Sequence, residues 1–372
     1  MRCFAGQTNM PTVRCSKTDL IRPEIQALSA YHVPDSKGMI KLDAMENPYT
    51  WPPELVAAWL ERLRTTQLNR YPHPTAPALK EQLRTAMSIP RDYELILGNG
   101  SDELIQLIML AIATPDRVVV APEPSFAMYR MSASFTGMRY VSVPLQTPDF
   151  SLDLDAMLTA IAEQRPALIF LAYPNNPTGN LFASESVHEI IAAAPGLVVI
   201  DEAYFAFADH SFLAALSDYD NLLLLRTVSK MGLAGLRLGL LIGPSHWLNE
   251  LDKVRLPYNI NVLTQISAVF ALQHQSILDE QIQRIRHDRA ALYAALADLP
   301  SCQAFPSAAN FILVRTPRHQ GDRLAEALRK QGILVKNLNH SSELLHDCLR
   351  ITVGTPAENK ALIAALKTAL QN

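Results

Sequence analysis

The sequence predicts an α/β protein in which a large domain with a mostly parallel seven-stranded sheet precedes a smaller α/β domain at the C-terminus. At 372 residues the chain is too long for one small core. Short apolar, β-branched runs alternate with helical patterns through its middle, which is the signature of a mostly parallel sheet. Helical periodicity then dominates the last hundred residues, which add only two candidate strands.

Seven short apolar runs are the expected strands of the large sheet. They are Leu95–Leu97, Val118–Ala121, Arg139–Val143, Ala167–Ala172, Leu197–Ile200, Leu222–Arg226 and Leu238–Ile242. Helices are expected between them at Ser101–Ala113, with Ser101 or Asp102 as the N-cap, and at Glu185–Ala194. No apolar run reaches the ~18 residues that a membrane helix needs, so we interpret the longest runs as buried strands.

The C-terminal part of the chain has a different pattern. Helical periodicity runs from Leu263 to Leu299, and strands are expected at Asn310–Val314 and Cys348–Val353. Between these strands, a helix at Asp322–Gln331 ends before Gly332, a typical glycine at this position. We therefore expect an N-terminal arm with part of the small domain in residues 1–49, a large domain in 50–262 and a small domain in 263–372.

Composition and charge exclude several classes of protein. A net charge of −3 gives no basic face for nucleic acid. The first ten residues lack the apolar stretch of a secretory signal, and Met10 is an alternative start. Four cysteines without CxxC spacing are expected to be reduced thiols in a cytoplasmic protein, and no motif predicts a metal site.

The segment SKMGLAGLRLG follows one of the expected strands and carries the most chemistry. Its Lys230 has a primary amine that can condense with an aldehyde, and burial lowers a lysine's pKa into a reactive range. Thr227, Ser229 and Arg237 lie close by in the sequence and suit a phosphate. An isolated Ser-Lys pair is more often a surface feature, but this context favours a lysine that carries a phosphorylated cofactor.

Two further motifs suit an aromatic nitrogen heterocycle. Asp201, at the strand end in VVIDEAY, can keep a ring nitrogen protonated, which makes the ring an electron sink. Tyr204 and Asn176, the latter in YPNNPTG, can each hydrogen-bond an oxygen on that ring. The plainer alternatives are a helix-capping Asp and an ordinary turn.

A third pair of motifs suits the phosphate and the ring face. In GNGSDE, the glycines let backbone approach a phosphate, and the helix that starts at Ser101 and Asp102 directs free N–H groups toward it. Phe126, in PSFAMY, can stack on the ring. An ordinary core aromatic is an equally good interpretation of Phe126 alone.

With ENPY, NRYP and CLRITVG added, the chain resembles the fold-type-I superfamily of pyridoxal-5′-phosphate aminotransferases, and within it the histidinol-phosphate aminotransferases, from about Ile21 onward. The resemblance implies transamination of L-histidinol phosphate with 2-oxoglutarate in histidine biosynthesis. It implies catalytic roles for Lys230, Asp201 and Tyr204. The cofactor-binding residues that it implies are Ser101, Asp102, Phe126, Asn176, Asp201, Tyr204, Thr227, Ser229, Lys230 and Arg237.

The resemblance also implies a homodimer and a set of substrate-binding residues. Tyr71, in NRYP, would reach the cofactor phosphate of the neighbouring subunit, although a core aromatic remains the alternative. Arg350, in CLRITVG, matches the family's substrate-anion arginine, and Lys336 could add a second positive charge unless it is a surface lysine. Tyr31 and Asn47 are weaker candidates for substrate contacts.

Three departures from the family pattern leave alternatives open. Met45 stands where many relatives have Asn, Arg237 follows Lys230 by seven residues, one fewer than in much of the superfamily, and Lys336 lies where some members have a phosphate-binding arginine. The last departure weakens the substrate assignment, because lysine lacks the bidentate fork of arginine. An aromatic-amino-acid aminotransferase and a threonine-phosphate decarboxylase therefore remain alternatives, and a non-enzymatic regulatory module is disfavoured because no DNA-binding segment precedes the domain.

Overall fold

The computed structural model describes residues 20–30 and 34–371 of the chain. These residues form two compact units that divide after Asp35. The first unit contains the short helix α2 (Pro23–Gln26), which has no buried residue. Tyr31 lies outside the described residues, so the substrate contact expected for it stays a prediction.

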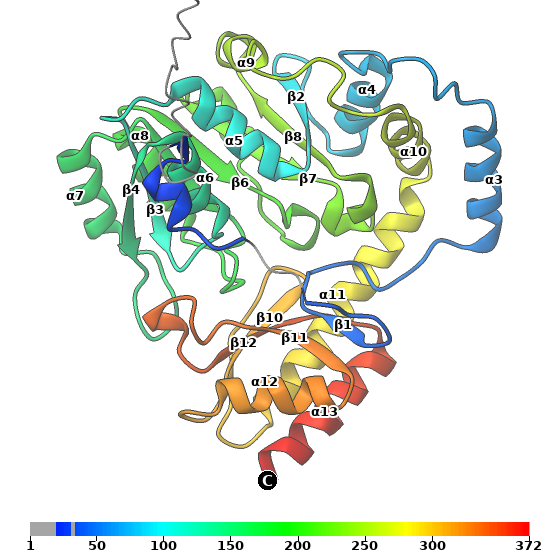
Figure 1. Ribbon diagram of the computed structural model, residues 1–372, viewed down its shortest axis with the longest axis vertical. Helices are drawn as coiled ribbons and strands as arrows, with labels where there is room; N and C mark the ends of the chain where they lie inside the picture. The colour runs from blue at the N-terminus through cyan, green and yellow to red at the C-terminus, as the bar shows by residue number, and fades with distance from the viewer. Residues whose placement is uncertain (1–19, 31–33, 372) are drawn as a thin grey trace, which may run out of the picture. The chain divides into compact units, whose positions relative to one another are not determined.

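The core of the second unit is a seven-stranded sheet, as the sequence predicts (Figure 1). In spatial order its strands are β2 (Glu94–Asn99), β8 (Leu238–Gly243), β7 (Leu222–Thr227), β6 (Leu197–Asp201), β5 (Leu168–Ala172), β3 (Val118–Glu123) and β4 (Arg139–Pro144). Strand β8 runs antiparallel to both of its neighbours, and the other pairs are parallel. The carboxyl ends of five adjacent strands, β7 to β4, therefore meet at one edge, where open sheets bind ligands.

Helices bury both faces of this sheet, which explains the continuous apolar runs in its strands. In β6, Val198 and Ile200 join one hydrophobic cluster, and Leu197 and Val199 join the other. The first cluster includes side chains from α4 (Pro77–Ala86), α7 (Leu154–Gln164) and α8 (Ser184–Ala193). The second includes side chains from α5 (Ser101–Ile112), α6 (Met128–Thr136) and α9 (Ser245–Asp252).

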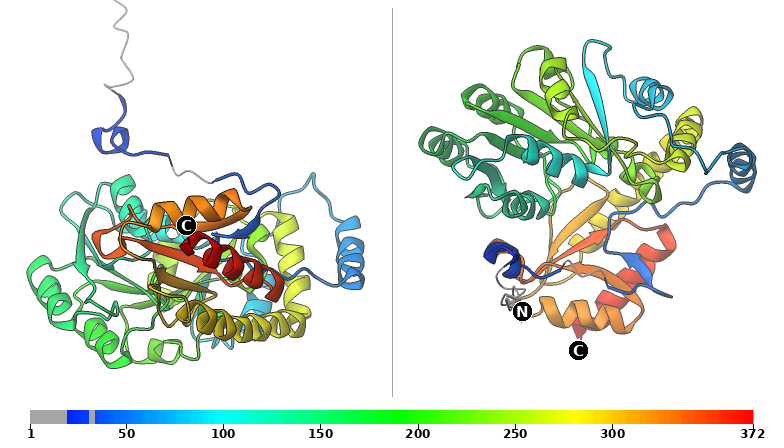
Figure 2. Two further views of the ribbon diagram at one scale, coloured as in Figure 1. Left: turned by 90° about the horizontal axis from the view of Figure 1, so that it is seen from below. Right: turned by 45° about the horizontal axis from the view of Figure 1, so that its top comes forward.

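A smaller, five-stranded sheet lies toward the C-terminal end (Figure 2). Its order is β1 (Ile40–Leu42), β11 (Ile333–Asn337), β12 (Cys348–Thr352), β10 (Phe311–Arg315) and β9 (Gln303–Ala304). Helices α11 (Gln275–Ala297), α12 (Gly321–Lys330) and α13 (Pro356–Gln371) pack with it and with one another. Strand β1 comes from far earlier in the chain, so residues before the large sheet help to build the small one.

Of two expectations about helices, the first is confirmed and the second is wrong. The periodic segment from Leu263 to Leu299 forms two helices, α10 (Val262–Gln273) and α11, which meet at His274. The N-cap predicted for α5 was wrong, because Gly100 occupies that position with a φ of 81°, and Ser101 and Asp102 form the first turn. The Glu103 carboxylate accepts a hydrogen bond from the N–H of Asn99 (2.7 Å), the residue before the N-cap.

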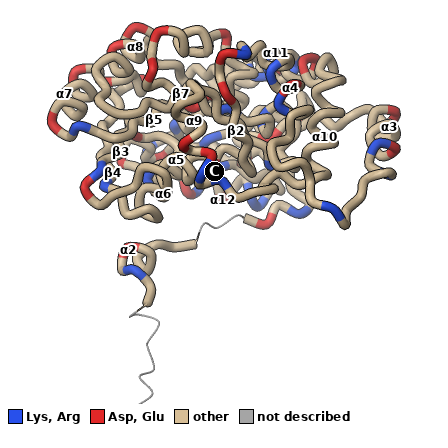
Figure 3. The backbone as a smooth tube through the Cα atoms, turned by 90° about the horizontal axis from the view of Figure 1, so that it is seen from above, with Lys and Arg blue, Asp and Glu red and all other residues tan. Residues whose placement is uncertain are grey.

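Acidic and basic positions are both spread over the backbone in the view of Figure 3. Over residues 20–30 and 34–371, no helix combines the length and the apolar character needed to cross a bilayer. Within the same ranges, His, Cys, Asp and Glu side chains do not gather into a metal-binding cluster of three or more.

Candidate active site

A pocket with about 550 Å³ of empty space opens at the carboxyl ends of the central strands. Its walls come from the strand ends, from the first turn of α5 and from the segment after β1. The lining residues are Met45, Ser101, Asp102, Phe126, Ala172, Pro174, Asn176, Asp201, Ala203, Tyr204, Thr227, Ser229, Lys230 and Arg237. All ten cofactor-binding residues expected within one chain are in this set.

One end of the pocket is shaped to receive an anion. Helix α5 begins directly after Gly100, and its first N–H groups have no partner within the helix. A Cβ at Gly100 would lie 2.5 Å from Nη2 of Arg237, and a Cβ at Gly239 of β8 would lie 2.6 Å from the Ser101 nitrogen. Glycine at both positions therefore lets the guanidinium and strand β8 approach the start of the helix.

Two hydroxyl groups complete this end of the pocket. Thr227 Oγ1 lies 2.9 Å from Ser229 Oγ and accepts a hydrogen bond from the Ser229 N–H (3.1 Å). Arg237 pairs with Asp102 at 3.4 Å, and both side chains are substantially exposed. A cation, two hydroxyls and a helix N-terminus are the donors that a phosphate group requires.

Lys230 also lines the pocket. Its Nζ donates a hydrogen bond to the Ala44 carbonyl at 3.4 Å and lies 5.8 Å from the centre of the Tyr204 ring. Burial, followed by the positive charge of Arg350, lowers the pKa of Lys230 to about 8. Roughly a tenth of its amine is then neutral at pH 7, several hundred times more than for an ordinary lysine, so Lys230 is a ready nucleophile.

Asp201 ends β6 and is almost completely buried, with 4% of its surface exposed. Its carboxylate accepts a hydrogen bond from the Tyr129 hydroxyl (2.7 Å) and another from the Ala203 N–H (3.0 Å). Burial nevertheless raises the pKa of Asp201 to about 6, because desolvation outweighs these two bonds. A positively charged N–H partner in the pocket would stabilise this carboxylate, and a protonated pyridine nitrogen is such a partner.

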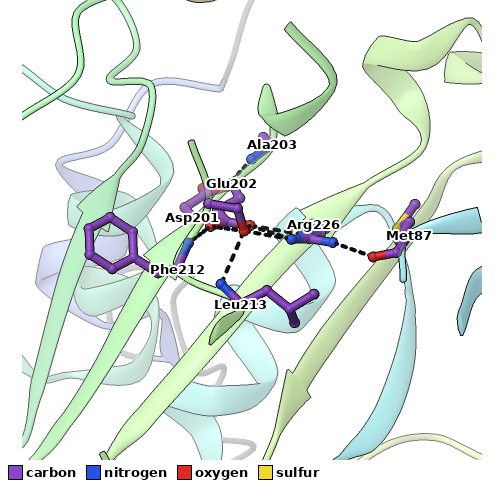
Figure 4. A network of polar contacts seen from close by, with 8 residues as sticks. Met87, Asp201, Glu202, Ala203, Phe212, Leu213 and Arg226 are labelled. Carbon is purple, nitrogen blue, oxygen red and sulfur yellow. Dashed lines mark hydrogen bonds and ion pairs between the residues drawn. The ribbon is translucent and has the colours of Figure 1, made fainter. Parts of the chain in front are cut away.

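The residue after Asp201 belongs to a separate, fully buried network (Figure 4). Glu202 pairs with Arg226 of β7 at 2.8 Å, and 0% and 3% of their side-chain surfaces are exposed. Glu202 also accepts the Phe212 N–H (2.7 Å), and Arg226 donates to the Met87 carbonyl (3.4 Å). These bonds satisfy charges that would otherwise be costly to bury, and they tie together the ends of β6 and β7 beside the pocket.

The small sheet contributes Arg350, on β12, to the border of the pocket. Its Nη1 donates to Asn176 Oδ1 at 2.6 Å, and its Nη2 donates to the Asp43 carbonyl at 2.9 Å. The guanidinium lies over the Phe311 ring (5.5 Å to the centroid), which contacts Tyr204 edge-on at 5.2 Å. Arg350 thus contacts Asn176, which lines the pocket, and packs through Phe311 against Tyr204, which also lines it.

Lys336 is the β11 residue that pairs directly with Arg350 across the small sheet. Directly opposed residues of antiparallel strands lie on the same face, so the two cationic side chains leave the sheet on one side. Lys336 is not among the described residues that line the pocket.

Asn47 and Tyr71 are also not among the pocket-lining residues that the structure describes. The Asn47 amide donates to Gln281 (2.9 Å) and to the Met231 carbonyl (3.3 Å), which fixes the segment next to Lys230. Tyr71 is 81% exposed and stacks on Tyr258, with 4.6 Å between the ring centroids. Within one chain, Tyr71 therefore does not line the pocket.

Sequence reasoning missed three groups at the site. Tyr129 lies three residues after Phe126, one helical turn along the same motif, and this spacing was an available signal. Glu202 and Arg226 each adjoin a motif residue, yet nothing in the sequence says that they pair. The Ala44 carbonyl is a backbone group, which a side-chain motif does not reveal.

The donor set fits pyridoxal phosphate. The anion-binding end suits its phosphate, the Lys230 amine suits its aldehyde, and the buried Asp201 carboxylate suits its protonated ring nitrogen. Phe126 lines the same pocket and offers an aromatic surface for the ring.

Comparisons with known proteins agree with this geometry. The model of the family "Aminotransferase class I and II" matches residues 37–366. Histidinol-phosphate aminotransferase 2 of Nitrosococcus oceani is 58% identical over 352 residues, covering 95% of this chain and 98% of that protein. The histidinol-phosphate aminotransferase of Chromobacterium violaceum is 51% identical over 348 residues, covering 94% and 97%.

A solved structure with a similar fold also belongs to an aminotransferase. The histidinol-phosphate aminotransferase of Sinorhizobium meliloti, in complex with pyridoxal-5′-phosphate, has a TM-score of 0.83 at 25% identity and covers 95% of this chain and 98% of that one. L-threonine-O-3-phosphate decarboxylase of Porphyromonas gingivalis has a TM-score of 0.74 at 22% identity, covering 90% and 100%, which shows a shared fold alone. With a family match across nearly its whole length and a pocket that fits the cofactor, the chain belongs to the class I and II aminotransferases, which here depend on pyridoxal phosphate.

Proposed function

We propose that this aminotransferase transfers the amino group of L-histidinol phosphate to 2-oxoglutarate, giving imidazole-acetol phosphate and glutamate in histidine biosynthesis. The observation that carries the proposal is the 58% identity, over almost the entire length of both chains, to a protein named for this substrate. We also place the enzyme in the cytoplasm, because four cysteines without CxxC spacing favour reduced thiols.

The assignment of the cofactor-binding residues is part of the proposal. Thr227, Ser229, Arg237 and the N-terminus of α5 would hold the phosphate. Pyridoxal phosphate, when bound, supplies an aldehyde that condenses with amines and a ring that accepts electrons. The Asn176 and Tyr204 side chains, which line the same pocket, would hydrogen-bond the ring oxygen.

The protein's own part in the reaction is to move and hold protons. Lys230 Nζ, with its pKa lowered to about 8, is neutral often enough to take the proton from Cα of the amino donor. Asp201 holds a proton on the ring nitrogen by remaining ionised next to it. Lys230 would then pass this proton to the carbon that carried the cofactor's aldehyde, and in the second half-reaction it would move a proton back to Cα of the new glutamate.

Arg350 would bind the anionic end of each substrate. Histidinol phosphate carries a phosphate, and glutamate carries carboxylates, so one guanidinium serves both if it offers a bidentate fork. Arg350 is held beside the pocket by Asn176 and the Asp43 carbonyl. Lys336, its partner in register, would add positive charge that suits a phosphate more than a carboxylate.

We also propose a homodimer in which Tyr71 completes the neighbouring site. Apolar side chains are unusually exposed on α3 (Pro53–Arg64), on the chain after it and around the start of α10. They are Leu60 (53% exposed), Leu68 (70%), Tyr71 (81%), Leu256 (72%), Tyr258 (41%) and Leu263 (43%). A patch of this kind on an enzyme surface marks a protein interface.

The domain boundaries predicted from the sequence remain part of the proposal. The strands of the seven-stranded sheet all lie between residues 94 and 243, and β9 to β12 lie between 303 and 352. A large domain in 50–262 and a small one in 263–372, completed by β1 from the N-terminal arm, accommodate both sheets.

The test is donor specificity of the purified holoenzyme. Histidinol phosphate, phenylalanine and threonine phosphate are supplied separately with 2-oxoglutarate, and glutamate and CO₂ are measured. Glutamate formed mainly with histidinol phosphate is the expected result. A preference for phenylalanine would indicate an aromatic-amino-acid aminotransferase, and CO₂ from threonine phosphate would indicate the decarboxylase.

A further inference from the structure

Tyr129 is a fully buried residue that the reaction described above does not use. Its side chain comes from α6, and its hydroxyl donates a 2.7 Å hydrogen bond to Oδ2 of Asp201. The tyrosine is 0% exposed, so no water competes for this bond. Since a phenol has one proton, that proton is committed to the Asp201 carboxylate.

Packing fixes where the Tyr129 hydroxyl lies. The ring stacks on Phe170 of β5, with 4.5 Å between centroids and an interplanar angle of 8°. Its other contact is Phe126, edge-on at 5.6 Å and 87°, and Phe126 lines the cofactor pocket. One side chain thus contacts both the carboxylate and an aromatic wall of the pocket.

The Asp201 carboxylate is consequently held from two sides. Oδ2 accepts the Tyr129 hydroxyl, and Oδ1 accepts the Ala203 N–H at 3.0 Å. Each oxygen keeps a further lone pair, and Asp201 itself lines the pocket. The two donors therefore fix the orientation of the carboxylate without using up its capacity to accept a third bond.

The other charged and titratable groups around Asp201 oppose its ionisation. Asp102 of α5 and the neighbouring Glu202 both raise the pKa of Asp201, although Glu202 is paired with Arg226. Burial has the largest effect in the same direction. Tyr129 and the Ala203 N–H are the groups that lower it, so the phenol is the one side chain among these contributors that favours the ionised form.

We propose that Tyr129 is a positioning residue that keeps Asp201 ionised and oriented for the ring nitrogen of the cofactor. Removing its hydroxyl leaves the fold intact but leaves the carboxylate with one donor in an apolar site. Asp201 then takes up a proton more readily, and a protonated Asp201 no longer holds a proton on its partner. Only the predicted effect on kcat depends on the proposed transamination; the predicted titration of Asp201 does not.

The test replaces Tyr129 with Phe, which keeps both ring contacts. In the full-length protein freed of cofactor and labelled with ¹³C at aspartate Cγ, infrared spectra are recorded against pH. The carboxyl signal that is lost in Asp201→Asn identifies the group. Its titration should move upward by about one pH unit in Tyr129→Phe, as expected for a lost charged hydrogen bond.

Tyr140→Phe is the matched control. Tyr140, on β4, is a substantially buried tyrosine whose hydroxyl bonds a different carboxylate, Glu123. This variant should leave the Asp201 titration where it is in the unaltered protein. Equal shifts in both variants, or no shift in Tyr129→Phe, would overturn the proposal.

The holoenzyme supplies the second measurement. With Tyr129→Phe, kcat should fall about fivefold near pH 6 and recover toward pH 8, while KM changes little, because the defect lies in ionisation and not in substrate binding. A loss of kcat that is the same at every pH would indicate a structural defect and contradict the inference. If the Asp201 titration moves yet histidinol phosphate is not a substrate, the proposed function fails and the role of Tyr129 stands.

Discussion

Lys230 and Asp201 are both placed where burial disfavours their charged forms. For the lysine this lowers the pKa to about 8, and for the aspartate it raises the pKa to about 6. The two shifts bring a reactive amine and a carboxylate into the same pH range. Between these values, a useful fraction of the lysine is neutral while the aspartate is mostly ionised, which is the combination that transamination requires.

The Lys230 shift predicts how cofactor attachment depends on pH. The rate at which the cofactor-free protein gains the absorbance of bound pyridoxal phosphate should rise about fivefold from pH 7 to pH 8, and less than twofold from pH 8 to pH 9, because neutral amine saturates above a pKa of about 8. Lys230→Ala should show no covalent attachment. A tenfold rise for each pH unit up to pH 10 would mean that the lysine is unperturbed.

At the level of single residues, the sequence motifs lie around one pocket, and the roles assigned to their residues stay predictions. The cofactor-site residues assigned to motifs converge there, since each motif follows a strand and the strand ends share one edge. Tyr129 was missed because its role depends on a contact with a residue 72 positions away, between α6 and β6. The spacing from Phe126 points to Tyr129, but a tertiary hydrogen bond of this kind leaves no local pattern that identifies its partner.

At the level of secondary-structure elements, long buried elements were predictable and short ones were not. The strands of the large sheet are five or six residues long, and all except the edge strand β4 are mostly buried, which gives a clear signal. Strands β1 and β9 have three and two residues, and they exist only because a neighbouring strand pairs with them. The start of α5 was misassigned because its N-cap is Gly100, which has no side chain that could signal a cap.

The pairing of β11 with β12 leads to a prediction about substrate selection. Arg350 contacts Asn176, which lines the pocket. Lys336 of β11 lies directly opposite Arg350 of β12. Arg350→Ala should impair the half-reactions with both histidinol phosphate and glutamate. Lys336→Ala should weaken the histidinol-phosphate half selectively, by ~1–3 kcal/mol, the loss expected for a charged hydrogen bond.

Single-turnover rates for each half-reaction measure this difference. Lys360→Ala, a change in a lysine of α13 outside the described pocket lining, serves as the control for a lost surface charge. Equal losses with the two substrates in Lys336→Ala would show that this lysine does not discriminate phosphate from carboxylate.

At the level of the whole molecule, association of two chains would account for two features. It would cover the exposed apolar side chains, and it would bring Tyr71 to a pocket other than that of its own chain. Helix α3 projects beside α10, away from the large sheet (Figure 1), and Trp51 contacts Trp59 and Phe270, which ties the two helices together. Tyr71 follows α3 and stacks on Tyr258. This contact orients the Tyr71 side chain, although most of its surface stays exposed. A second chain that covers this patch would bury the apolar surface and give Tyr71 a partner.

A shared site predicts recovery of activity in hybrid dimers. Lys230→Ala and Tyr71→Phe should each be nearly inactive as homodimers, since every pocket then lacks its amine or its neighbour's tyrosine hydroxyl. In a hybrid, one pocket carries both lesions and the other carries neither. Refolding an equimolar mixture should therefore give about half hybrids and about a quarter of the unaltered activity, because one of the two sites in each hybrid is intact.

Size-exclusion chromatography with light scattering at assay concentration establishes the oligomeric state independently. A monomer by scattering, or a dimer whose mixtures stay as inactive as the separate variants, would show that Tyr71 does not act across the interface.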